Sequence, residues 1–277
     1  MTKPAPEYVA ARRTLLDALD ALSAHHPSLV LIGAQAVYLH TGSQGTNVPP
    51  TTTDADLALD TDLLADDPEI AATLQAAGFV PGQPGHWENS QGIAVDLMVA
   101  PHQSNRQSAS ARAAHLTSHA KSVARIGPGL ALALSDNAPQ SITALDSSDS
   151  RRHEIRVAGP AALLVAKAIK LDDRLADASQ GNSRRIVDKD ALDVLRLLQA
   201  CPISQFLAGL SWQNADTAAQ ADIARGLQIL RDRATDRTHD LPVLATRASG
   251  DDPTVAASLA VLVRELLTAM SVGSNES

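Results

Sequence analysis

In the stretch TTTDADLALD, residues 51–60, acidic and apolar side chains alternate over residues 54–57 and an apolar run follows to residue 59. Such alternation is typical of a half-buried β-strand, in which successive side chains point to opposite faces of a sheet. Asp54 and Asp56 would then project from the same face, about 7 Å apart along the backbone. Two carboxylates on one face can share a metal ion.

A third aspartate lies in the middle of an apolar run. The segment HWENSQGIAVDLMVA, residues 86–100, predicts a hairpin whose second strand carries Asp96. An ionised carboxylate among aliphatic side chains is costly unless it is paired or bound to a cation. If this strand neighbours the strand of Asp54 and Asp56, three carboxylates converge and match the oxygen ligands that Mg²⁺ prefers. Two such ions can stabilise both the attacking and the leaving oxygen in a displacement at phosphorus.

The rest of the first half mixes helical and strand patterns around these two strands. The pattern predicts an α+β unit in residues 1–158, with a mixed sheet flanked by helices. The expected elements are a helix over residues 7–24, a strand over 28–32 that ends at Gly33, a short helix over 34–40, a loop over 41–53, a helix over 66–77 and a strand over 151–159.

The second half, residues 159–277, reads as successive helices and predicts a helical domain. A helix begins at Pro160, and others follow, including 214–233 and 253–270. Two of these helices have a polar stripe opposite an apolar face. The first stripe consists of Lys167, Lys170 and Arg174, and the second of Lys189, Asp193 and Arg196.

Composition narrows the function classes. The chain has 277 residues, 44% of them hydrophobic, one cysteine and a formal charge of −8. The N-terminus has no apolar signal segment, and no long uninterrupted apolar run occurs, so we expect a cytoplasmic protein with no membrane span. A net negative charge repels nucleic acid unless a local basic patch exists. Residues 97–135 hold no acidic residue and include Arg106, Arg112, Lys121 and Arg125; they form either such a patch or an ordinary solvated surface.

Five segments together resemble the polymerase β-like nucleotidyltransferases, most closely the AbiEii/MenT-type toxin nucleotidyltransferases. They lie between about residue 28 and residue 198. They are LIGAQAVYLHTG (31–42), TTTDADLALD (51–60), GIAVDLMVAP (92–101), VAGPAALLVAKAIKLDDR (157–174) and RRIVDKDALDVLRLL (184–198).

The resemblance implies roles for individual residues. Asp54 and Asp56 would hold Mg²⁺ or Mn²⁺ with the incoming NTP, and Asp96 would be the third metal ligand and activate the acceptor hydroxyl. Lys167 would contact the nucleotide phosphates, with Lys170 adding positive charge. Asp193 matches a further acidic position, for which Asp188 and Asp190 are alternatives.

The resemblance also implies that the helical domain completes the nucleotide cleft, and it implies a reaction and partners. A nucleoside monophosphate would be transferred from NTP to an acceptor hydroxyl, the 3′ end of tRNA, by a toxin that a separate antitoxin protein neutralises. Two rivals stay open. One is transfer to a small molecule, such as an antibiotic, or to a protein. The other is a nucleotide-binding module without catalysis.

One departure from the family pattern concerns the phosphate-binding turn. The superfamily usually has Gly-Gly or Gly-Ser after the first strand, where this chain has Gly33-Ala34 followed by Gln35. Backbone N–H groups at a helix start bind phosphate without a hydroxyl, so Gly33 and Ala34 could serve. Gly42-Ser43 is a competing choice, but Gly33 directly follows an apolar strand, and we favour it.

Overall fold

The computed structural model describes residues 4–42, 48–106, 108, 110–181, 188–211 and 215–273. It divides into two compact units, and each is described by itself below. Unit 1 comprises residues 1–36 and 49–158, and unit 2 comprises residues 37–48 and 159–277. The expected domains 1–158 and 159–277 stay a prediction, which limited proteolysis would check.

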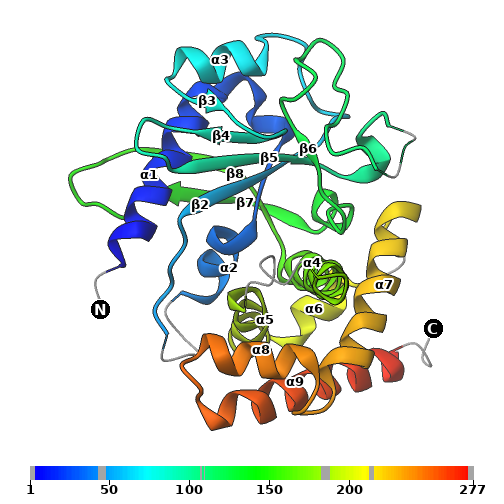
Figure 1. Ribbon diagram of the computed structural model, residues 1–277. Helices are drawn as coiled ribbons and strands as arrows, with labels where there is room; N and C mark the ends of the chain where they lie inside the picture. The colour runs from blue at the N-terminus through cyan, green and yellow to red at the C-terminus, as the bar shows by residue number, and fades with distance from the viewer. Residues whose placement is uncertain are drawn as a thin grey trace. The chain divides into compact units, whose positions relative to one another are not determined.

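Unit 1 is built on one mixed sheet (Figure 1). The strand order is β3-β4-β5-β2-β1-β8-β7, and β6 pairs with β5 outside this path. The β2–β5, β1–β8 and β5–β6 pairs are parallel and the others antiparallel, so the expected mixed sheet is confirmed. The strands are β1 Leu29–Ile32, β2 Asp54–Leu59, β3 Val80–Pro81, β4 His86–Glu88, β5 Ala94–Val99, β6 Arg125–Ile126, β7 Asn137–Thr143 and β8 Arg152–Ala158.

Two helices accompany the sheet in unit 1. Helix α1, Pro6–Ala21, has proline in its first turn and packs against β2 and β5. Helix α3, Ile70–Ala76, is capped by Glu69, whose carboxylate accepts a hydrogen bond from the Ala72 N–H at 2.7 Å. The expected start of this helix at residue 66 was wrong. The residue before a proline disfavours the helical conformation, and the helix begins only after Pro68.

The sequence did not predict strand β7. Its segment NAPQSIT contains a proline and mostly polar side chains, which argues against a central strand. In the structure β7 pairs only with β8 and forms an edge of the sheet, where a proline is tolerated.

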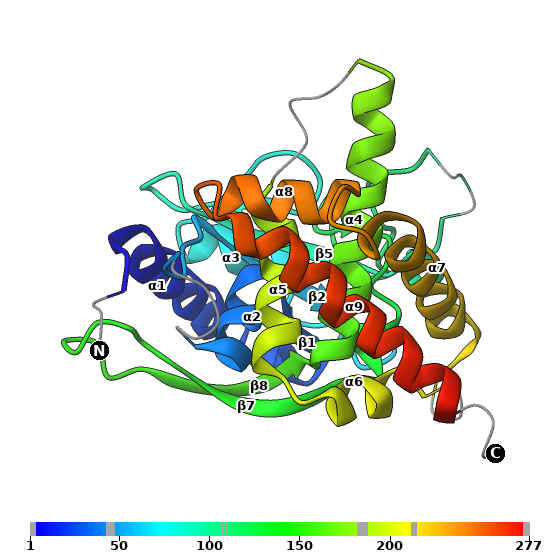
Figure 2. The ribbon, with the colours of Figure 1, turned by 90° about the horizontal axis from the view of Figure 1, so that it is seen from below.

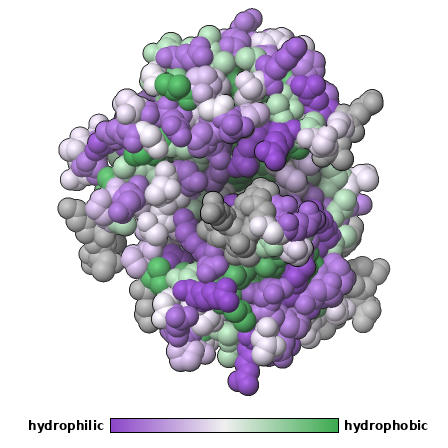
Figure 3. Space-filling view, in the orientation of Figure 1, coloured by the Kyte–Doolittle hydropathy of each residue, from purple (hydrophilic) through white to green (hydrophobic). Residues whose placement is uncertain are grey.

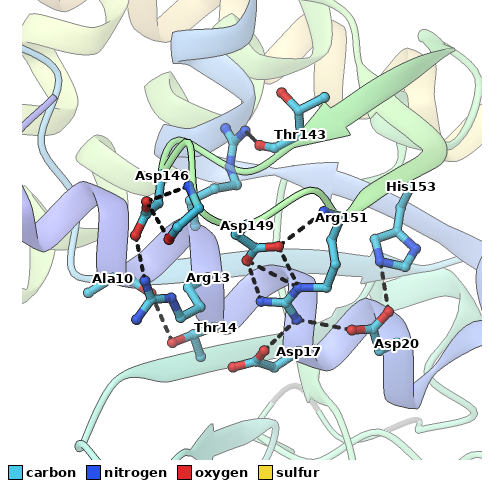
Figure 4. A network of polar contacts seen from close by, with 12 residues as sticks. Ala10, Arg13, Thr14, Asp17, Asp20, Thr143, Asp146, Asp149, Arg151 and His153 are labelled. Carbon is cyan, nitrogen blue, oxygen red and sulfur yellow. Dashed lines mark hydrogen bonds and ion pairs between the residues drawn. The ribbon is translucent and has the colours of Figure 1, made fainter. Parts of the chain in front are cut away.

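A polar network ties the end of the β7–β8 hairpin to α1 (Figure 4). The Arg151 guanidinium donates to Asp149 at 2.7 Å and to Asp17 at 2.6 Å, while Arg13 donates to Asp146 at 2.8 Å. The bonds from Arg151 lower the pKa of Asp149 to about 2. Because these side chains are partly exposed, each pair contributes little to stability, and the network chiefly fixes where the loop lies.

Unit 2 is helical, as expected. Figure 2 shows α4, α5, α8 and α9 close together, and α4 also packs against α7. The expected helices over 214–233 and 253–270 correspond to α7 and α9, whereas α6 and α8 were not predicted. The helices are α4 Pro160–Ser179, α5 Lys189–Ala200, α6 Ile203–Gly209, α7 Thr217–Ala234, α8 Asp240–Ala248 and α9 Pro253–Gly273; α2, Gly33–Thr41, runs from unit 1 into unit 2.

Two observations bear on the cellular setting. Within α9, residues Pro253–Ser271 are long and apolar enough to span a membrane by length and composition, a test that core helices also pass. The helix carries Arg264 and Glu265 and packs against α5, α7 and α8. The face seen in Figure 3 is mainly hydrophilic. A cytoplasmic location stays a prediction.

The single cysteine is expected to be unreactive as a nucleophile at neutral pH. Cys201 is free and buried, and burial raises the pKa of its thiol to about 11. The reactive thiolate is therefore scarce near neutral pH.

Candidate functional site

Three acidic side chains share one face of the central strands in unit 1. Strands β2 and β5 are parallel neighbours, and Asp56 pairs directly with Asp96. Laterally paired residues point to the same face, and Asp54 lies two residues before Asp56 on that face. The alternate residues Ala55 and Leu57 are completely buried on the opposite face. The sheet register therefore places on one face the three aspartates that the sequence singled out.

Arg125 supplies a positive charge to two of these aspartates. It begins β6, the strand that pairs with β5, and its Nη2 lies 2.9 Å from Asp96 Oδ2 and 4.0 Å from Asp56 Oδ1. The aspartate side chains are only 13% and 15% exposed, so an unpaired charge on either would be costly. The guanidinium offsets part of the repulsion between the two carboxylates.

His86 bridges the site to a further acidic side chain. It pairs with Asp96 across the β4–β5 hairpin, and its Nδ1 lies 2.7 Å from Asp96 Oδ1 while its Nε2 lies 2.9 Å from Glu88 Oε1. Burial alone would lower the pKa of His86, but the hydrogen bonds to Glu88 and Asp96 outweigh it, and the pKa is raised. Each ring nitrogen of His86 therefore has a carboxylate oxygen as its hydrogen-bond partner.

The Gly33 turn lies against Asp56. Gly33 follows β1 with φ +68°, a left-handed conformation, and a Cβ there would lie 2.0 Å from Asp56 Oδ2. Only glycine meets both conditions. The competing turn is less informative, because Ser43 lies outside the described residues and a Cβ on Gly42 would meet nothing within 4 Å. The glycine that touches the acidic face is thus Gly33, beside the buried Ala34.

Hard oxygen donors on one face fit a divalent cation in kind. Gly33 leaves room for the Asp56 carboxylate, and a cationic group, the Arg125 guanidinium, already lies where Asp56 and Asp96 approach each other. Across the described part of the chain, however, no three histidine, cysteine or acidic side chains are grouped closely enough to hold a metal ion. The three carboxylates therefore suit a divalent cation in their chemistry and in the face that they share, but their positions in this structure do not form a metal cluster.

The stripe of Lys167, Lys170 and Arg174 in unit 2 contains one buried lysine. Lys167 is 5% exposed, and its Nζ lies 2.5 Å from Asp190 Oδ1 and 2.7 Å from Asp193 Oδ2, both on α5. Burial by itself would lower the lysine pKa, but Asp190 and Asp193 raise it, so the ammonium stays charged. Lys170 and Arg174 also bind Asp190.

Both polar stripes contain buried members. Lys167 on the first stripe is 5% exposed, and on the second stripe Asp193 is 0% and Arg196 2% exposed. Periodicity identified a polar stripe on each helix but could not show that the stripes of α4 and α5 face each other. Asp188 makes no such contact with Lys167, whereas Asp190 and Asp193 both do.

The acid-free segment 97–135 has two different environments. Arg106, Arg112 and Lys121 are exposed, as a basic patch requires, whereas Arg125 turns to Asp96. Sequence reasoning missed His86 and the role of Arg125 at Asp96. The register of the expected hairpin could have identified His86, because counting outward from its turn pairs residue 86 with residue 96.

Comparison with family models identifies the family of this chain. A family model described as "Nucleotidyltransferase" matches residues 11–215, most of the chain and all three aspartates. The chain belongs to this nucleotidyltransferase family. The expected enzyme class is thereby confirmed, as is the α+β fold class with a helical C-terminal region.

The solved structures and the curated proteins add little to this family assignment. A crystal structure of an antigenic nucleotidyltransferase-like protein from Paracoccidioides brasiliensis aligns with 17% identity and a TM-score of 0.42, covering 80% of this chain and 90% of that one. No curated protein matches the nucleotidyltransferase sequence.

Proposed function

We propose that this nucleotidyltransferase transfers a nucleoside monophosphate from NTP to an acceptor hydroxyl, with Asp54, Asp56 and Asp96 as its metal ligands. The observation that carries the proposal is the direct pairing of Asp56 with Asp96 on adjacent parallel strands. A bound Mg²⁺ or Mn²⁺ would supply Lewis-acid stabilisation of charge at the α-phosphate. The acceptor oxygen forms a bond to the α-phosphorus, the bond to the β-phosphate oxygen breaks, and pyrophosphate leaves.

The chain's own residues have distinct parts in this proposal. Asp96 receives the proton of the acceptor hydroxyl, and His86 and Arg125 hold its carboxylate in place. The backbone N–H groups of Gly33 and Ala34, at the start of α2, contact the nucleotide phosphates.

In unit 2, Lys167 and Lys170 contribute positive charge toward the phosphates, and Asp193 fixes the Lys167 ammonium. Lys170 is the more accessible of the two, with a side chain 42% exposed. This part of the proposal predicts that Lys170→Met raises the KM for NTP, whereas Lys167→Met also destabilises the fold.

As acceptor we propose the 3′ end of tRNA, with a cognate antitoxin as protein partner, in the cytoplasm. The exposed Arg106, Arg112 and Lys121 favour RNA, because they lie in a segment without acidic residues. The formal charge of −8 favours the second candidate, a small-molecule or protein acceptor that needs no basic surface.

Labelling of the acceptor tests both candidates. Purified protein is incubated with each α-³²P-labelled NTP, Mg²⁺, and total RNA, candidate antibiotics or a protein extract. Label in tRNA supports the toxin proposal, and label only in another acceptor rejects it. Asp56→Asn is the control and should abolish incorporation. No incorporation with wild-type protein, and nucleotide binding unchanged in Asp56→Asn, would support a binding module instead.

A further inference from the structure

Asp54 is held by two hydrogen bonds at the start of β2. The Thr52 hydroxyl donates to Asp54 Oδ1 at 2.7 Å, and the Gln35 side-chain amide donates to the Asp54 main-chain carbonyl at 3.0 Å. Thr52 is 2% exposed and Gln35 is 1% exposed. Because one carboxylate oxygen is fixed by Thr52, the rotation of the whole group about its Cβ–Cγ bond is fixed too.

Gln35 is itself oriented by a buried arginine. Arg12 Nε donates to Gln35 Oε1 at 2.8 Å. A guanidinium can only donate, so the glutamine oxygen faces Arg12 and its NH₂ faces the Asp54 carbonyl. The other nitrogens of Arg12 donate to the Thr143 carbonyl at 2.9 Å and to the Tyr8 hydroxyl at 3.0 Å.

Burying the charged side chain of Arg12 costs stability that an apolar side chain at the same position would not. It is 2% exposed, and among the described residues it forms no ion pair with a carboxylate. Burial lowers the pKa of Arg12, which shows that the charge is held in a poorly solvating place. A buried cation bonded only to neutral oxygens costs stability relative to an apolar side chain of similar size. What it gains is a fixed orientation for Gln35, at the turn that follows Gly33.

We propose that Thr52, Gln35 and Arg12 are positioning residues that orient Asp54 for metal binding. Thr52 acts on the carboxylate and Gln35, held by Arg12, acts on the backbone of the same residue. The inference rests on the proposed function, because it takes Asp54 as a metal ligand. In the Gly33-Ala34-Gln35 turn, the Gln35 side chain thus bonds the backbone of Asp54, a contact that the shorter serine of a Gly-Ser turn would not make.

Mn²⁺ binding to the full chain, followed by electron paramagnetic resonance without nucleotide, tests this proposal. Thr52→Val keeps the shape and removes the hydroxyl, and we expect the Mn²⁺ affinity to fall about 10- to 100-fold, as for partners that orient metal ligands. Thr52→Ser keeps the hydroxyl and should restore affinity to within about threefold of wild type. Gln35→Met should weaken Mn²⁺ binding in the same direction.

A matched control separates orientation from stability. Thr14 is also a buried threonine of unit 1, and its hydroxyl bonds to Ala10 and Asn89 rather than to Asp54. Thr14→Val should lower the melting temperature without changing the Mn²⁺ affinity. Unfolding curves for all variants confirm that each protein is folded at the temperature of the titration.

The outcomes distinguish failure of the positioning role from failure of the proposed metal site. If wild-type protein binds Mn²⁺ and Thr52→Val binds it equally well, the positioning role is overturned while the metal assignment stands. If Thr14→Val weakens Mn²⁺ binding as much as Thr52→Val does, the effect is one of stability and the positioning role is again overturned. A wild-type protein that binds no Mn²⁺ overturns the metal assignment and the positioning role with it.

Discussion

The Arg125 guanidinium lies 2.9 Å from Asp96 and 4.0 Å from Asp56, and so a side chain of this protein carries positive charge at the place proposed for a metal. A metal and a guanidinium compete for the same carboxylate oxygens. Metal affinity with and without the Arg125 guanidinium measures this competition.

Arg125→Met should strengthen metal binding in the absence of nucleotide. Removing one competing charge from a partly exposed pair is worth roughly 1 kcal/mol, which corresponds to about fivefold in affinity. Titration of Mn²⁺ into wild-type and variant protein measures the change. Lys121→Met removes one charge from the same segment at an exposed position and serves as control. Weaker Mn²⁺ binding to Arg125→Met would show that Arg125 and the metal do not compete.

Gly33→Ala should reduce nucleotidyl transfer by about 100-fold or more, because the new Cβ would displace the Asp56 carboxylate. Gly78→Ala is its matched control. Gly78 also has a positive φ, +88°, but a Cβ there meets nothing within 4 Å. Both variants carry left-handed strain of about 1–2 kcal/mol. If Gly33→Ala and Gly78→Ala lose the same amount of activity for the same loss of stability, the effect of Gly33→Ala does not come from a specific contact with Asp56.

Lys167→Met should lower the free energy of unfolding by about 3–5 kcal/mol, because Asp190 and Asp193 would be left buried without their shared ammonium. Lys170→Met, at an exposed position bound to the same Asp190, should cost less than about 1 kcal/mol. Urea unfolding measures both. Similar costs for the two variants would mean that the ion pairs of Lys167 contribute no more than a surface pair.

His25 should make the fold sensitive to acid. Its side chain is 1% exposed, its Nε2 lies 2.8 Å from the Pro68 carbonyl, and its Nδ1 has no partner among the described residues. Burial lowers the pKa of His25 below the usual 6.5, an effect that the Pro68 bond only partly offsets. The folded protein therefore binds fewer protons than the unfolded chain over the interval just below pH 6.5.

The sign of this effect follows from that difference. The contribution of neutral His25 to stability is complete above about pH 6.5 and is lost as the pH falls through the interval to its folded pKa. Melting temperatures of wild type and His25→Gln, measured from pH 7.5 to pH 5, test it. The wild type should lose more melting temperature than the variant on acidification, and parallel curves would refute the assignment.

The sequence by itself determined the chemistry of the acidic face and most of the elements that carry it. The alternation of acidic and apolar residues over 54–57 put Asp54 and Asp56 on one side of a strand, and the apolar run around Asp96 marked a second strand. Both signals are local, because the period of two in a strand is a property of the backbone.

Only the tertiary structure decided which of these segments are neighbours. The parallel pairing of β2 with β5 aligns Asp56 with Asp96, and β6 then adds Arg125. The packing of α4 against α5 brings members of the two polar stripes together in a buried ion cluster around Lys167. Periodicity predicts which residues share one face of a strand or helix. It does not predict which other strand or helix packs against that face, because the packing partner can lie far away in the sequence. Which elements pack together depends on the burial and hydrogen bonding of the whole sheet and its helices, and the sequence of a single segment does not determine it.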